Sequence, residues 1–189
     1  MEKLQIHTQR LVIRNLQPDD FENFYDYRSN PEVTKFQSFD IMTKERAQSF
    51  INDQKDKLFG QPEEWVQYAI ADKMTQKLIG DCAIKLDADC QIAEIGITIS
   101  HHKQKKGYAK EVFIGLLHFL FDVKKIHRVS ETVDAENTSS INLLKSTGFR
   151  QEGHFIENIF FKGKWGSEFQ FAMLKSEWDL KNKQVNEGN

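Results

Sequence analysis

Residues 104–110 have the composition of a turn that binds phosphate groups. They lead into a periodic helix expected over 109–121, whose first N–H groups have no partner inside the helix and form its positive end. Gly107 can take backbone angles closed to other residues, and Ala109 has almost no side chain, so a ligand can approach the main chain closely. We expect a ligand carrying a diphosphate here, although a solvated, lysine-rich turn before an ordinary helix would have a similar composition.

The residues around this turn exclude the two common phosphate-binding motifs and indicate a single anionic ligand. Gly107 is followed neither by the second glycine of Gly-x-Gly-x-x-Gly nor by the Lys-Ser/Thr of the Walker loop. Four lysines surround the turn: Lys103, Lys105, Lys106 and Lys110. The chain as a whole has a net charge of −2, which argues against general nucleic-acid binding. A single anionic ligand therefore explains the local basic cluster as well as a polymer would.

The spacing of apolar residues predicts the elements that position the turn. Strands are expected over 4–16, 65–71, 77–86, 91–100, 128–133, 153–162 and 167–174, and helices after Pro18, after Thr43, over 109–121 and over 139–147. Short turns between the strands from 65 to 100 predict an antiparallel meander. The strand, helix and strand from 91 to 133 predict a right-handed crossover and a parallel pair. The phosphate turn then follows the carboxyl end of the first strand of that pair, where α/β sheets bind ligands.

Composition and cysteine usage bound the class of protein. A length of 189 residues, with 39% hydrophobic and 29% charged residues, suits one soluble domain, which we assign to 1–180 with a polar tail at 181–189. Cys82 and Cys90 form no Cys-x-x-Cys pair, so zinc and thioredoxin-like sites are not expected. No charged-then-apolar leader opens the sequence and no apolar run approaches ~18 residues, which predicts a cytoplasmic protein.

Two further sets of side chains, a histidine pair and a phenylalanine pair, could line a functional site. His101 and His102 are adjacent, but no third ligand follows them at metal spacing, so we expect a solvated loop and no metal. Phe36 and Phe39 lie in a loop expected over 31–42, where they form either a lid on the core or a wall of a substrate site.

Several stretches together resemble the GNAT N-acetyltransferases. The turn resembles the acyl-CoA pyrophosphate loop, Gln/Arg-x-x-Gly-x-Gly/Ala, of that family. A later segment resembles its Asn-x-x-Ser/Ala-x-x-Leu-x-x-x-Gly-Phe motif. Thr8-Gln-Arg10-Leu11-Val-Ile-Arg14 and Ala172-Met-Leu174-Lys-Ser-Glu177-Trp178 resemble the RimJ/RimL subgroup, which acetylates protein N-termini, including ribosomal ones. The two main motifs read Gln104-Lys-Lys-Gly107-Tyr-Ala109 and Asn137-Thr-Ser-Ser140-Ile-Asn-Leu143-Leu144-Lys-Ser-Thr-Gly148-Phe149.

The resemblance implies an α/β fold with a mixed sheet of six or seven strands and about four helices. In this fold the two central parallel strands splay apart, and the pantetheine arm of acetyl-CoA lies between them. It also implies which residues bind the cofactor. These are Ile97, Thr98, Ile99, Gln104, Lys105, Lys106, Gly107, Tyr108, Ala109, Lys110, Asn137, Asn142 and Lys145. Lys145 is either a ligand of the terminal phosphate or an ordinary exposed helix lysine.

The implied reaction is direct attack of a primary amine on the thioester, which requires a group that takes a proton from the amine. Glu94 is the candidate base, although an exposed strand carboxylate with no role fits the same pattern. Many relatives have, at the position of Leu144, a tyrosine that acts as the general acid. A leucine side chain cannot donate a proton, so this chain lacks that acid. Ser140 either hydrogen-bonds the leaving thiolate or caps the following helix. Asn137 is expected beside the reacting thioester, and Glu157 is a weaker acid or base candidate.

The acceptor amine is not specified by these residues. A protein N-terminus, an antibiotic amine and a polyamine all remain open, as does a catalytically silent acyl-CoA-binding module on the same fold. The acceptor walls are expected in the loop at 29–42 and in the hairpin around Trp165. Ser167 stands where subgroup members often carry Asp, which removes a charge that would face the amine. Relatives are often dimers, so a homodimer is a further expectation.

Overall fold

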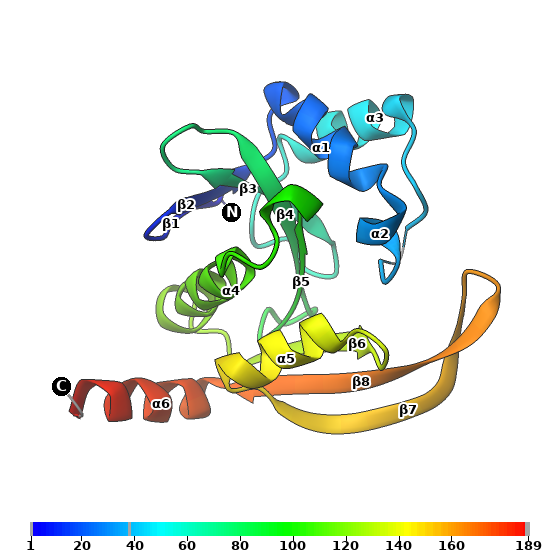
Figure 1. Cartoon of the computed structure of the whole chain (residues 1–189). Coiled ribbons are helices and arrows are strands. Elements are labelled where there is room, and N and C mark those ends of the chain that lie inside the picture. The colour runs from blue at the N-terminus through cyan, green and yellow to red at the C-terminus, as the bar shows by residue number, and fades with distance from the viewer. Residues whose placement is uncertain (1, 38, 188–189) are drawn as a thin grey trace.

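The computed structural model describes residues 2–37 and 39–187, and in them the strands form one eight-stranded mixed sheet. The strands follow each other across the sheet in the order β1-β2-β3-β4-β5-β6-β8-β7 (Figure 1). Their bounds are β1 Gln5–His7, β2 Leu11–Asn15, β3 Val66–Asp72, β4 Leu78–Leu86, β5 Ile92–Ile99, β6 Arg128–Asp134, β7 Arg150–Phe161 and β8 Lys164–Leu174. The expected α/β fold is confirmed, with one strand more than the resemblance implies.

The helices begin where their capping residues predict. Thr43 accepts a hydrogen bond from the N–H of Arg46, and Asn137 accepts one from the N–H of Ser140, so both are N-caps. Gly148 closes its helix in the left-handed conformation. The α-helices are α1 Phe21–Arg28, α2 Pro31–Thr34, α3 Lys44–Gln54, α4 Tyr108–Leu117, α5 Thr138–Thr147 and α6 Lys175–Glu187. None of the helices among the described residues is long and apolar enough to cross a membrane.

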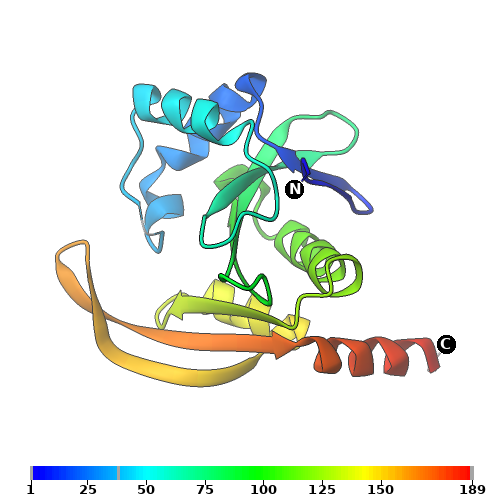
Figure 2. The same cartoon turned by 180° about the vertical axis from the view of Figure 1, so that it is seen from behind.

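Two clusters of buried side chains cover opposite faces of the sheet. The larger cluster joins inward residues of β2–β6 to the apolar stripe of α4, which includes Val112, Phe113 and Leu116. The smaller cluster packs α1 and α3 against the other face of β3 and β4. Figures 1 and 2 show α1, α2 and α3 gathered together, with α4 and α5 beside the central strands. Arg28 and Tyr27 of α1 both bind the buried Asp81 of β4, which fixes α1 to the sheet.

The central parallel pair separates soon after it begins. β5 pairs with β4 along its whole length, from Ala93 to Ile99. On its other side β5 pairs with β6 only at three positions, the last of which joins Glu94 to Ser130. The remaining edge of β5, from residue 95 onward, therefore has no strand partner on the side of β6. This fork is the splayed pair that the resemblance implies.

Some elements differ from the sequence-based expectation. The single strand expected over 4–16 is the β1–β2 hairpin, because Thr8 closes a turn by bonding to Leu11. The expected loop at 31–42 contains the short helix α2, whose N-cap is Asn30. The polar tail expected from residue 181 is the continuation of α6 through Glu187. The turn of the last hairpin lies at Lys162 and Gly163 rather than around Trp165.

Candidate active site

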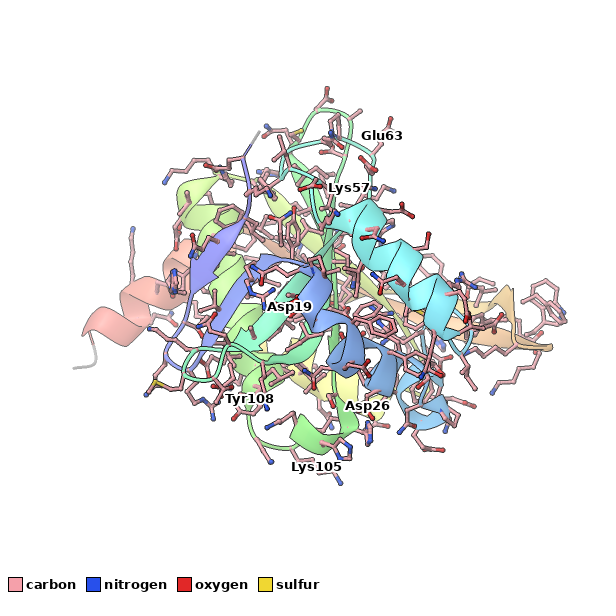
Figure 3. All side chains as sticks on the ribbon, turned by 90° about the horizontal axis from the view of Figure 1, so that it is seen from above. Asp19, Asp26, Lys57, Glu63, Lys105 and Tyr108 are labelled. Atoms are coloured by element: carbon pink, nitrogen blue, oxygen red, sulfur yellow. The ribbon has the colours of Figure 1, made fainter. Side chains whose placement is uncertain are left out.

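The turn before α4 has the backbone geometry of an anion-binding site. Gly107 is the N-cap of α4 and has a φ of 79°, a conformation that favours glycine. Lys105 also has a positive φ of 60°, so the chain turns sharply just before the helix. The first N–H groups of a helix have no partner inside it, and here four lysines add positive charge. Viewed from above, Lys105 lies at the outer edge of the molecule and Tyr108 at the start of the helix (Figure 3).

Arg10, from the amino-terminal motif, fastens this turn to the β1–β2 hairpin. Its guanidinium donates to the carbonyl of Lys106 at 3.1 Å and lies 4.4 Å from the centre of the Tyr108 ring. Arg10 also forms an ion pair with Glu111 of α4, at 2.6 Å. The Tyr108 ring therefore packs against Arg10, and its contact with the cofactor stays a prediction. Arg10 holds the turn in place, with its Nη2 3.5 Å from where a Cβ on Gly107 would lie.

The unpaired edge of β5 leads directly into this turn. Residues 97–99 lie on that edge, where a ligand arm would find free main-chain groups. The side chain of Gln104 donates to the carbonyl of Ile99 at 3.1 Å and so ties the strand end to the turn. The expected pantetheine and pyrophosphate positions are therefore continuous in space.

A cavity of about 240 Å³ lies at the fork between β5 and β6. Successive residues of a strand point to opposite faces, so the lining divides into two sides. Ile95, Ile97, Glu131 and Val133 belong to the face that α4 and α5 cover. The opposite side, toward α1 and α2, is lined by Glu94, Gly96, Thr132, Asp134, Trp65, Phe36 and Gln37. The cavity thus connects the cofactor side of the sheet with its other face.

Glu94 lies at this cavity with half of its side chain exposed. Lys85 of the neighbouring strand is 3.8 Å away, a loose ion pair across β4 and β5. Glu94 is therefore accessible from the side of α1 and α2 and faces the cavity rather than bulk solvent alone. This position is compatible with a proton acceptor, and its role stays a prediction.

Asn137 and Ser140 line the cavity from the first turn of α5. The Asn137 side chain accepts from the Ser140 N–H at 3.2 Å, so Asn137 and not Ser140 is the cap. The Ser140 hydroxyl is therefore not required for capping, which removes one of its two interpretations. Asn142 and Lys145 are exposed on α5 outside the cavity lining, and their cofactor contacts stay predictions.

Glu131 is a site residue that the sequence reasoning missed. It projects from β6 into the cavity, and its Oε2 is fully buried without a hydrogen-bond partner among the described residues. Burial raises the pKa of Glu131 from 4.5 to about 8. The signal in the sequence was a charge on an apolar strand face, because Glu131 alternates with the buried Val129 and Val133.

The acceptor walls agree in part with expectation. Phe36 of the 31–42 loop and Ile159 and Phe161 of β7 line the cavity. Phe39 instead packs over the guanidinium of Arg28, at 4.0 Å. The two phenylalanines therefore take the two alternative roles, wall and core. Lys162, at the hairpin tip, donates to the carbonyl of Thr34, so the tip reaches α2 (Figure 1).

Other expected residues lie outside the cavity lining. Trp165 is largely exposed on β8, and Glu157 is exposed on β7 with a positive φ of 46°. Ser167 accepts a hydrogen bond from the N–H of Glu157 at 2.9 Å, so it holds the hairpin together. The next residue, Glu168, lines the cavity and supplies a carboxylate there.

A possible metal-binding group and a larger groove lie elsewhere on the molecule. Asp26 of α1 lies beside His101 and His102, so the structure supplies a third potential metal ligand that the sequence spacing did not reveal. Asp26 and His102 are exposed. A larger groove of about 820 Å³ runs between β1 and α4, lined by Ile6 and Ile114 among others. It lies away from the fork, so we place the reaction in the smaller cavity.

Comparison with known proteins identifies the family. A family model described as an acetyltransferase (GNAT) domain matches residues 10–150. The Bacillus subtilis (strain 168) protein named uncharacterized N-acetyltransferase YnaD is 31% identical over 176 residues, covering 93% of this chain and 100% of that protein. A crystal structure of a GNAT-family acetyltransferase from Bacillus anthracis has a TM-score of 0.83 at 26% identity, covering 92% of this chain and 99% of that one.

A second solved structure contains ligands. The spermidine N-acetyltransferase from Vibrio cholerae, in complex with CoA and spermine, has a TM-score of 0.76 at 20% identity and covers 89% of this chain and 98% of that one. The family model over residues 10–150 and the likeness to YnaD over 93% of this chain identify the family. The chain therefore belongs to the GNAT acetyltransferases and is an N-acetyltransferase that uses acetyl-CoA.

Proposed function

We propose that this enzyme acetylates a primary amine carried by a small polycationic molecule, with a polyamine as the best-fitting class. In this proposal, acetyl-CoA lies along the free edge of β5 with its pyrophosphate against the turn at 104–110. The acceptor enters the cavity from the side of α1 and α2. Glu94 takes the proton from the amine, and Asn137 and Ser140 lie along the cofactor arm.

The observation that carries the acceptor class is the charge of the cavity lining. Among the described residues that line it there is no lysine, arginine or histidine, and besides the enclosed Glu131 the acidic side chains are Glu94, Asp134 and Glu168. Clefts lined by one sign of charge concentrate ligands of the opposite sign. A molecule with several ammonium groups can form a favourable electrostatic contact with this lining at each of them. A monoamine can form such a contact only once, so it should bind more weakly. The lining therefore favours a polycation over a neutral amine.

The apolar walls and the size of the cavity support the same class. Phe36, Trp65, Ile159 and Phe161 provide surfaces against which the alkyl segments of a polyamine can pack. A volume of about 240 Å³ admits a slender chain more readily than the end of a folded protein. The similar Vibrio cholerae enzyme was solved with spermine. These points support the proposal over a protein N-terminus, which remains the second candidate because of the resemblance to RimJ/RimL.

The test is the release of free CoA thiol with a panel of amines. Spermidine and spermine are compared with butylamine, which offers one primary amine without further charge, and with a short peptide bearing a free N-terminal alanine. We expect kcat/KM for the polyamines to exceed that for butylamine by at least about tenfold, because each additional ion contact adds on the order of 1 kcal/mol. Glu168→Gln should raise KM for polyamines and leave butylamine unchanged.

The outcomes separate the hypotheses. Faster turnover of the peptide than of every polyamine would assign the enzyme to N-terminal acetylation. Equal kcat/KM for butylamine and spermidine would show that the acidic lining does not select the acceptor. CoA binding without thiol release on any of these amines would show that the acceptor belongs to none of the tested classes.

A further inference from the structure

We propose that Glu131 is the acid that protonates the departing CoA thiolate. This inference rests on the acetyl transfer proposed above and assigns the proton donor of the same site. The step needs a donor on the cofactor side of the cavity, and Leu144, in the position where the resemblance implies a tyrosine, cannot serve. Leu144 is also completely buried in the core.

The position of Glu131 in the sheet places its carboxyl at the fork. The last residue of β6 that pairs with β5 is Ser130, so Glu131 is the first residue after the strands separate. Its side chain shares a strand face with Val129 and Val133, which pack in the core beneath α4 and α5. Glu94, the proposed base, projects from the opposite face of the sheet. The two carboxyl groups therefore approach the cavity from opposite sides.

This arrangement matches the two proton transfers that the reaction requires. The amine arrives on the side of Glu94, and the sulfur of the cofactor arm arrives on the side of Glu131. Asn137 and Ser140, which line the cavity on the cofactor side, come from the first turn of α5. Ser140 can donate a hydrogen bond to sulfur, but a hydroxyl is a much weaker acid than a carboxyl. Glu131 is thus the group on this side with a proton to give.

The surroundings of Glu131 keep that proton in place before the reaction. Its Oε2 is enclosed without a partner in the described part of the chain, and its neighbour on β8 is the buried Phe171. The other titratable groups that line the cavity are Glu94 on β5, Asp134 on β6 and Glu168 on β8. None of these groups is a cation, and α5 contributes only the neutral Asn137 and Ser140. Burial favours the neutral form of the Glu131 carboxyl.

The proton and electron balance of the step is complete. The amine nitrogen attacks the thioester carbon, and the carbon–sulfur bond breaks with its electron pair passing to sulfur. Glu131 gives its proton to sulfur and becomes a carboxylate, while Glu94 takes one proton from the nitrogen. Transfer of that proton through water from Glu94 to Glu131 restores both groups. The products are the acetylated amine and CoA with a free thiol.

The first test compares Glu131→Gln with wild type and with Glu22→Gln, which makes the same change at an exposed site on α1. Glutamine keeps the shape of the side chain but has no acidic proton. We expect kcat of Glu131→Gln to fall at least about tenfold, consistent with the size of general acid effects, with CoA affinity by calorimetry within twofold of wild type. Glu131→Asp, which keeps a carboxyl group on a shorter side chain, should have a kcat between those of Glu131→Gln and wild type.

The pH profile of kcat provides a readout that a structural role would not change. In wild type, kcat should decline on the basic side as Glu131 loses its proton, and in Glu131→Gln this basic limb should disappear. A Gln variant with wild-type kcat and an unchanged basic limb would overturn the assignment. Thiol release absent even in wild type would instead overturn the proposed function, and with it this step.

Discussion

At the scale of single residues, the site depends on carboxyl groups that share a cavity but not an environment. Glu94 is half exposed and has Lys85 nearby, whereas Glu131 is enclosed beside apolar side chains. Burial raises the pKa of the Glu131 carboxyl to about 8, so Glu131 holds its proton more tightly than an exposed glutamate does. The same residue type can therefore serve as acid and as base within one cavity.

The role of Glu94 predicts a specific kinetic change. Glu94→Gln should lower kcat by about a hundredfold or more, because it removes the proton acceptor, and leave the CoA dissociation constant nearly unchanged. Steady-state rates and calorimetry measure the two quantities. Rates within about twofold of wild type would show that Glu94 is an ordinary exposed strand residue.

The burial of Glu131 predicts a dependence of stability on pH. Its pKa is about 8 in the folded protein against a usual value of 4.5, so the folded state holds a proton that the unfolded state releases. The stabilisation is complete below about pH 4 and is lost as the pH rises through 8, at about 1.4 kcal/mol per unit of pKa difference. Urea unfolding between pH 5 and 9 should show a steeper decline for wild type than for Glu131→Gln. Parallel curves would contradict the raised pKa.

Residue-level prediction from the sequence succeeded where a local pattern exists. The helix expected over 139–147 is α5, Thr138–Thr147, whose ends are set by the local caps Asn137 and Gly148. Glu131 was missed because its significance depends on enclosure by β8 and α5, which are distant in the sequence. The approach of Asp26 to His101 was missed for the same reason.

At the scale of elements, the turn and helix at 104–117 show why local patterns predict some segments better than others. The 3.6-residue stripe of α4 and the glycine before it specify both the helix and its start. The β1–β2 turn has no glycine or proline, and Thr8 closes it through its own side chain. A turn that is closed by side-chain hydrogen bonds has only a weak signature in the sequence. The sequence therefore predicts a single strand over 4–16 where the structure has a hairpin.

The turn before α4 predicts how a single substitution affects cofactor binding. Gly107→Glu should abolish CoA binding, because it places negative charge and bulk where the pyrophosphate approaches the helix terminus. Gly163→Glu is the matched control, since Gly163 also has a positive φ, of 81°, but lies in the hairpin turn with open space around it. Calorimetry should detect CoA binding to the control only. Unchanged affinity in a folded Gly107→Glu protein would refute the loop assignment.

At the scale of the whole molecule, part of the topology was predictable because the meander and the crossover repeat common connections. The chain order did not indicate that β8 lies beside β6 with β7 at the edge. The two strands of the last hairpin were expected close to where they occur, over 153–162 and 167–174. Its exposed apolar residues include Ile156 and Phe160.

These residues predict where self-association would occur. A homodimer, expected from the resemblance, would bury Ile156 and Phe160, because exposed apolar side chains grouped on one element favour association. Replacing both by Glu should reduce the mass measured by light scattering to that of a monomer. Met74→Glu, at a still more exposed apolar residue on the β3–β4 turn, is the control. A monomeric wild-type protein would show that this expectation is wrong.

The fork between β5 and β6 has a consequence for the traffic of molecules through the enzyme. Because the cavity opens toward both faces of the sheet, the donor and the acceptor need not share an entrance. In the proposed binding mode, CoA leaves along the free edge of β5 and the acetylated amine leaves past α2. The order in which the two products depart would then not be fixed by a shared exit.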